Sequence, residues 1–144
     1  MAPATRLLRY LWAAPYTVPG LLLGAVAVVF GARAARRQGV VEVCGGRIGA
    51  VLGRGPAGLG FSAMTLGHVI LAVDRSALEQ LRLHEQVHVR QYEWWGPLFV
   101  PAYLLASLVQ LLRGRHPYRD NPFERQAYAA VAERRRLTRE STRY

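Results

Sequence analysis

The stretch His84-Glu85-Gln86-Val87-His88 decides the fold, because it places two histidines and a glutamate together on one helix. Histidines four residues apart lie one above the other on a helix face. Their ring nitrogens can therefore reach one Zn²⁺ ion at about 2.0–2.1 Å. Glu85 projects beside that position, where its carboxylate can take a proton from a water molecule. We expect His84 and His88 to be metal ligands and Glu85 to be the catalytic base.

The helix that carries this stretch is expected to run from about Ala77 to Trp95. Asp74 or Ser76 is its expected N-cap, and the pair Gly96-Pro97 disfavours its continuation. Glu85 falls on a stripe that otherwise consists of core residues, and a polar group buried there needs a partner. The rival interpretation is a coincidence, in which two histidines and a glutamate lie on a solvated helix face.

A catalytic zinc needs a third protein ligand and an open position for water. The best candidate is Glu124, because the Asn-Pro pair before it suits the start of a last helix, from about Pro122 to Arg136. The alternative role of Glu124 is a favourable negative charge at a helix N-terminus. A shared metal also requires the apolar segment 98–112 to fold back as a hairpin helix, antiparallel to the motif helix. Glu124 then arrives level with His84.

Two stretches carry no charged side chain, residues 10–32 and residues 94–112. Each is long enough for a helix close to the hydrocarbon thickness of a membrane, about 30 Å. The first has aromatic residues at its start and arginines at its end, as membrane spans do. We therefore predict an uncleaved transmembrane helix in an N-terminal anchor, residues 1–36, regular from about Val18 to Ala35. A signal peptide cleaved after this helix is the rival interpretation.

Residues 40–73 differ from both apolar stretches, because they contain short β-rich runs separated by glycines. This pattern predicts a small antiparallel β-sheet of three or four strands after a basic hinge, residues 33–39. The expected strands are Val40–Val43, Ile48–Leu52 and one or two within Phe61–Val73. The expected fold class is therefore α+β.

Length and composition bound the remaining possibilities. The chain has 144 residues, enough for one core, and 51% of them are hydrophobic, too many for a disordered chain. We assign residues 37–136 to one domain and residues 137–144 to a basic tail. The single cysteine, Cys44, excludes an intrachain disulfide and a four-cysteine zinc site.

The charge is strongly positive, with 19 basic residues, all arginine, against 9 acidic ones. Many of the arginines lie between Arg113 and Arg143. We interpret this segment as a flank beside anionic lipid headgroups. Nucleic acid is not an expected partner, because the segment lacks the interleaved aromatic residues on which single-stranded bases stack.

The order of these elements resembles that of a known class of enzymes. The matching motifs are the strand Thr65-Leu66-Gly67-His68-Val69-Ile70-Leu71, the His-Glu-x-x-His-x-x-Gln pattern of residues 84–91, then Gly96-Pro97-Leu98 and Asn121-Pro122-Phe123-Glu124. Over about residues 60–130 the chain resembles gluzincin-type zinc metallopeptidases. It is most similar to the very small bacterial membrane proteins of minigluzincin type, a likeness that implies a zincin-like fold.

This resemblance also implies roles for individual residues. His84, His88 and Glu124 become the zinc ligands, and Glu85 becomes the general base and acid. The strand that ends near Leu71 would hold an extended peptide by β-augmentation. Its implied substrate-binding residues are Thr65, Leu66, Gly67, His68 and Val69.

No motif fixes the residue that stabilises the transition state. The candidates are Tyr118, Arg119 and Tyr128. Tyr128 stands four positions after Glu124, where related enzymes often carry an acidic residue that orients a histidine ligand.

The sequence thus predicts a membrane-associated zinc metallopeptidase that hydrolyses peptide bonds of a peptide or protein substrate. Most arginines follow the first helix, so we expect the catalytic part in the cytoplasm or at the inner leaflet of a bacterial plasma membrane. The alternative is a non-catalytic membrane adaptor with a structural or vestigial metal site. A fourth ligand such as His68 or His116 would favour that alternative.

Overall fold

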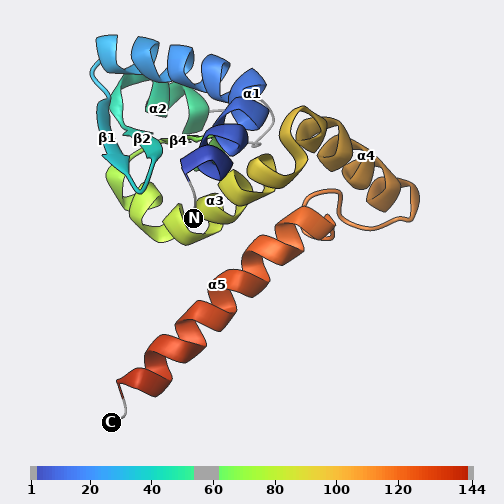
Figure 1. Cartoon of the computed structure of the whole chain (residues 1–144). Helices are drawn as coiled ribbons and strands as arrows, with labels where there is room; N and C mark the ends of the chain where they lie inside the picture. Colours follow the sequence, from blue (N-terminus) through green and yellow to red (C-terminus); the bar gives the residue numbers. More distant parts are fainter. Residues whose placement is uncertain (1–2, 54–61, 143–144) are drawn as a thin grey trace.

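The computed structural model describes residues 3–53 and 62–142 and has an α+β fold, as predicted (Figure 1). One four-stranded sheet has the strand order β1-β2-β4-β3. Its strands are β1 (Arg33–Arg37), β2 (Val40–Cys44), β3 (Ala63–Leu66) and β4 (Val69–Ala72). The helices are α1 (Pro3–Val29), α2 (Gly46–Gly53), α3 (Arg75–Trp95), α4 (Phe99–Leu112) and α5 (Pro122–Ser141), with a 3₁₀ turn, η2 (Gly96–Leu98), before α4.

The sheet is mixed, so the prediction of a purely antiparallel sheet is wrong. β1 and β2 are antiparallel, as are β3 and β4, but β2 and β4 lie parallel in the centre. A parallel pair needs a crossover connection, which α2 begins directly after β2. Residues 48–52, predicted to be a strand, lie in α2. Gly49 allows this placement, because its Cα lies against the backbone of Val73 and leaves no room for a side chain.

The residues predicted to be a basic hinge form the edge strand β1. All five of its side chains are exposed, so no alternation of apolar and polar residues marks it as a strand. Gln38 and Gly39 connect it to β2 with φ angles of 51° and 85°. Positive φ at both central residues is typical of the tightest hairpin turns. Phe61, the expected start of the last β segment, lies outside the described residues.

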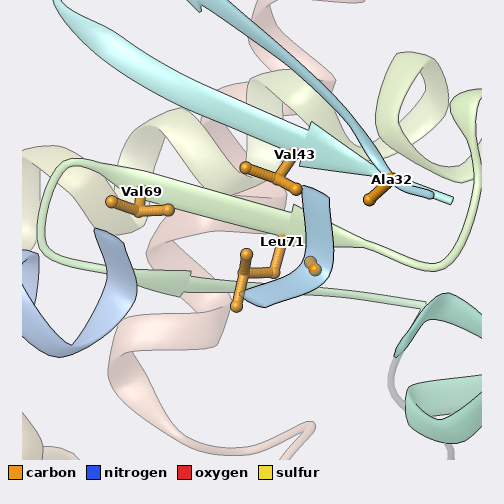
Figure 2. Close-up of a cluster of buried hydrophobic side chains, with 5 residues drawn as sticks. Ala32, Val43, Val69 and Leu71 are labelled. Carbon is orange, nitrogen blue, oxygen red and sulfur yellow. The ribbon is translucent and has the colours of Figure 1, made fainter. Parts of the chain in front are cut away.

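The sheet is buried between α1 on one face and α3 on the other. Side chains of a strand alternate between the two faces, and β4 follows this rule. Val69 and Leu71 pack with Val43 and with Ala27 of α1 (Figure 2). Ile70 and Ala72, the alternate residues of β4, pack instead with Leu78 and Val89 of α3.

α1 starts earlier and ends earlier than predicted, at Pro3 and Val29, and includes two prolines. A stripe of small residues lets it lie close to the sheet. A methyl group on Gly20 would lie 3.0 Å from side-chain atoms of Leu66 and Val69, and one on Gly24 would lie 3.2 Å from Val43. Two stretches, Leu7–Val29 and Arg75–Leu112, are long and apolar enough to cross a membrane, by length and composition only.

The path of the chain after α3 differs from the predicted hairpin. Figure 1 shows that α4 extends beyond the end of α3 instead of folding back along it. α5 occupies that place and runs antiparallel to α3, so that Phe123 packs on Trp95 and Gln126 meets Gln91. The chain changes direction between α3 and α4 at η2, where Gly96 has a φ of 53° and lies against the indole ring of Trp12.

We expect Gly20→Leu to lower the stability of the fold, because the added side chain would force α1 away from the sheet. Overpacking of a closely packed site costs about 1–3 kcal/mol. Thermal unfolding in detergent, followed by circular dichroism, measures the effect. Leu22→Ala is the control, because the Leu22 side chain is exposed. Equal stability of Gly20→Leu and the native protein would contradict this packing.

Candidate metal centre

The structure brings together the three side chains predicted to bind metal. His84 and His88 project from one face of α3, and Glu124 reaches them from the first turn of α5. One donor atom from each side chain lies within 4.8 Å of the other two, and all three residues are buried. The cap of α3 is Asp74, whose carboxylate accepts from the backbone N–H of Ala77. The cap of α5 is Asn121, as predicted.

The donor atoms are spaced as ligands of one tetrahedral metal ion. His84 Nε2 lies 3.1 Å from His88 Nε2 and 3.0 Å from Glu124 Oε2. His88 Nε2 lies 3.3 Å from Glu124 Oε1. Ligand atoms at about 2.0–2.1 Å from a tetrahedral zinc are separated by about 3.3 Å. Within the described part of the chain, Glu124 Oε2 is buried without a hydrogen-bond partner, which also fits a cation between the three side chains.

Gln91 orients one of the two imidazoles. Its Oε1 lies 2.7 Å from His88 Nδ1, and its Nε2 donates to the carbonyl of Phe123 and to Oε1 of Gln126. Because the amide oxygen accepts, Nδ1 of His88 carries a proton, and Nε2 is the nitrogen that would give its lone pair to a bound metal ion. Gln91 stands in the motif of the sequence, but its link to α5 follows only from the packing of the two helices.

Glu124 is held by groups from three directions. Tyr103 of α4 donates from its hydroxyl to Glu124 Oε1 at 2.8 Å, a contact that the sequence did not predict. Burial alone would raise the pKa of the Glu124 carboxyl. The contacts with His84 and His88 and the bond from Tyr103 outweigh burial, so the pKa of this carboxyl lies well below its usual range. The side chain is therefore an anion, the form in which a carboxylate binds a metal ion.

Glu85, the predicted base, is also buried, and it is held by the sheet. The Thr65 hydroxyl of β3 lies 2.6 Å from Glu85 Oε2 and donates to it. This contact points the carboxylate toward the edge strand of the sheet, on the wall of the cavity that it shares with His88 and Glu124. Thr65 was predicted only as part of a substrate-binding strand.

A cavity of about 300 Å³ adjoins the candidate metal centre, and two of its three side chains, His88 and Glu124, line it. Glu85 also reaches its wall. The rest of the wall comes from β3, the end of α3, α4 and the turn after α4, and it is mainly apolar. These residues are Ala63, Met64, Thr65, Leu66, Tyr92, Phe99, Val100, Tyr103 and Tyr118.

The three candidates for transition-state stabilisation occupy different places. Tyr118 lines the cavity, where burial and then interactions with Tyr128 and Glu124 raise the pKa of its phenol. Tyr128 packs its ring on that of His84, with centroids 4.7 Å apart. Arg119 is exposed and is not among the residues that line the cavity. The geometry therefore favours Tyr118, a protonated donor within the cavity.

The predicted substrate strand is only partly an edge. Thr65 and Leu66 belong to β3, which lies at the edge of the sheet and lines the cavity. Gly67 and His68 form the turn, and Val69 opens β4, which is hydrogen-bonded to strands on both sides. The expectation that the strand ending near Leu71 binds an extended peptide is therefore wrong, because that strand has no free edge.

Neither remaining histidine joins the centre. His68 is buried between Thr17 and Glu93, with its Nε2 3.2 Å from Glu93 Oε1. His116 is exposed and accepts backbone N–H groups at its own turn. Across residues 3–53 and 62–142, the group of side chains that could hold a metal ion thus has three members, which would leave one tetrahedral position for water.

Comparison with protein-family models, curated proteins and solved structures finds no match to this chain.

We expect the purified protein to bind one zinc ion, and we expect His84→Ala, His88→Ala and Glu124→Ala to lose it. Loss of one of three protein ligands removes the donor set of a catalytic site. Metal analysis after dialysis against zinc measures the effect. His116→Ala is the matched control, because His116 lies outside the cluster and is exposed. Equal zinc content in all four variants would show that the cluster holds no metal.

Proposed function

We propose that the protein is a membrane-associated zinc-dependent metallopeptidase with a zincin-like arrangement of helices and sheet. The observation that carries the proposal is the position of Glu85. It lies between the His84–His88–Glu124 cluster and an edge strand, on the wall of a cavity. A buried carboxylate that is not a ligand but adjoins the ligands is the group that such hydrolysis requires.

A zinc ion held by His84, His88 and Glu124 would polarise the scissile carbonyl and lower the pKa of water at the site. Glu85 takes a proton from the attacking water on its carboxylate and gives it to the amide nitrogen that leaves. The Thr65 hydroxyl bonds one oxygen of that carboxylate and keeps it in reach of the cavity. Tyr118, whose phenol lines the cavity, donates to the carbonyl oxygen as negative charge develops there.

The edge of β3 is suited to bind the substrate backbone. The Val73 N–H donates to the carbonyl of Ser62, so the bonded pairs of the β3–β4 ladder are those at Ser62, Met64 and Leu66. The backbone groups of the alternate residues, Ala63 and Thr65, therefore point away from β4. The Thr65 carbonyl already accepts from the Tyr92 hydroxyl, at 3.3 Å. An extended peptide that pairs with this edge would pass along the cavity wall.

A fourth protein ligand would favour the alternative, a non-catalytic adaptor with a structural or vestigial metal site. His68 and His116, the two side chains proposed for that role, are bound elsewhere in the structure. Their positions therefore support the peptidase over the adaptor. The apolar stretches Leu7–Val29 and Arg75–Leu112 support the membrane association, and we propose a bacterial plasma membrane as its site.

We expect Glu85→Gln to keep zinc and to lose turnover by about 10²–10⁴-fold, because an amide cannot accept the proton of the attacking water. Hydrolysis of a fluorescence-quenched library of unstructured peptides, run beside metal analysis, measures both quantities. Glu133→Gln is the matched control, because Glu133 lies on the exposed surface of α5. Unchanged turnover in Glu85→Gln would reject Glu85 as the base.

We expect Thr65→Val to lower kcat by about ten- to a hundredfold, the loss that corresponds to a missing hydrogen bond to a charged group. Zinc content stays the same, because the Thr65 hydroxyl bonds Glu85 and none of the three candidate ligands. Thr65→Ser restores the hydroxyl and should recover most of the rate. Equal rates for the valine and serine variants would show that the hydroxyl does not position Glu85.

A further inference from the structure

α4 has two apolar faces with different surroundings. Phe99, Val100 and Tyr103 form one wall of the cavity beside the metal centre. The opposite face is exposed to the solvent, although no charged side chain occurs between Trp94 and Leu112. It consists of Leu104, Leu105, Leu108, Leu111 and Leu112, which are 49–78% exposed. A contiguous apolar face of this kind marks an interaction surface.

α1 presents a second exposed apolar surface, and the sheet limits how it can meet a membrane. Leu21, Leu22 and Leu23 are exposed, whereas Gly20 and Gly24 lie against β-strands. The sheet therefore lies beside the middle of α1. Behind these strands, the buried Glu42 of β2 is bonded to Arg82 of α3. If α1 crossed a bilayer, the strands packed on its middle and this charged pair would enter hydrocarbon, where each charge is strongly disfavoured.

The tryptophans gather where α1 meets the end of α3. Trp12, Trp94 and Trp95, which are the 3 tryptophans of the chain, are all exposed there. Trp12 Nε1 donates to the carbonyl of Trp94 at 3.3 Å, which ties the two helices together at this point. Indole rings prefer the boundary between lipid and water. α5 runs back along α3 from here, so its arginine-rich end lies far from α4 (Figure 1).

We propose that the exposed apolar faces of α1 and α4 form a membrane seat, a surface that inserts into one leaflet of a lipid bilayer while neither helix crosses it. Lipid fits this surface better than a second protein copy, because the face is free of charge, is bounded by indoles, and lies far from the arginine-rich end of α5. Since α4 is both a wall of the cavity and part of the seat, the cavity then opens at the lipid surface. The substrate is accordingly a polypeptide segment that lies at the membrane surface, and this part rests on the proposed peptidase function.

The seat is tested with the full chain diluted from detergent into preformed phosphatidylcholine vesicles, with and without phosphatidylglycerol. We expect the native protein to float with both kinds of vesicle, and the variant Leu104→Glu/Leu108→Glu to bind at least about tenfold more weakly. Leu137→Glu is the matched control, an exposed leucine near the far end of α5. Binding that requires phosphatidylglycerol and ignores the leucines, or a dimer that stays off vesicles, would overturn the proposal.

Single cysteines test whether α1 crosses. Cys44 is changed to Ser, and two exposed positions are changed to Cys one at a time: Thr5, near the start of α1, and Ala35, in β1 beyond the end of α1. A maleimide that does not cross membranes is added to intact vesicles that carry the bound protein. We expect both cysteines to react with it. Quenching of the tryptophans by brominated lipids should place the indoles at the interface. Protection of one cysteine until detergent is added would show a crossing helix and overturn the proposal.

The substrate class is tested with one peptide in two forms, free and carrying a palmitoyl chain. With vesicles present, we expect the native protein to cleave the acylated form at least about tenfold faster, and the Leu104→Glu/Leu108→Glu variant to lose this difference while it keeps zinc and cleaves the free form. Zinc-loaded native protein that cleaves neither peptide would reject the peptidase, whatever the flotation result. Equal cleavage of both peptides by vesicle-bound protein would reject the substrate class alone.

Discussion

The contact of one carboxylate with two imidazoles is the interaction on which the rest of the structure depends. Glu124 is buried as an anion, and a buried charge is stable only when opposite charges or donors surround it. His84, His88 and Tyr103 supply those partners from two other helices. The positions of α3, α4 and α5 relative to one another are therefore set around one small polar cluster in a chain with a modest core.

The parts of this arrangement that the sequence predicts are those with local signals. The spacing of His84 and His88 fixes their common face, and Pro122 after Asn121 marks the start of α5 within the chain. Both signals depend on residues within about one helical turn. They therefore predict local structure correctly even where the tertiary arrangement is not predicted. Glu124 joins the cluster as predicted from its chemistry, but the direction of α5, antiparallel to α3, does not follow from any local pattern.

The sheet was harder to predict, because its order depends on contacts between distant residues. β1 consists of arginine and alanine residues, which do not favour a strand by themselves. Its backbone is extended because it pairs with β2. α2 is rich in glycine, which disfavours helices, and is placed by the close approach of Gly49 to Val73. Tertiary contacts thus outweigh local propensity at both places. β4, expected at the edge, lies in the interior for the same reason, since α2 carries the chain past it to β3.

Asn121 connects the path of α4 to the metal cluster and explains why the chain does not form the expected hairpin. Its side chain is fully buried, donates to the Tyr103 carbonyl and the Ser107 hydroxyl of α4, and accepts the N–H of Phe123 at the start of α5. One side chain therefore fixes α4 and the first turn of α5 together. If α4 packed along α3, it would take the place that α5 needs to bring Glu124 to the imidazoles. The divergence of α4 is thus the condition for both the cluster and the cavity that adjoins it.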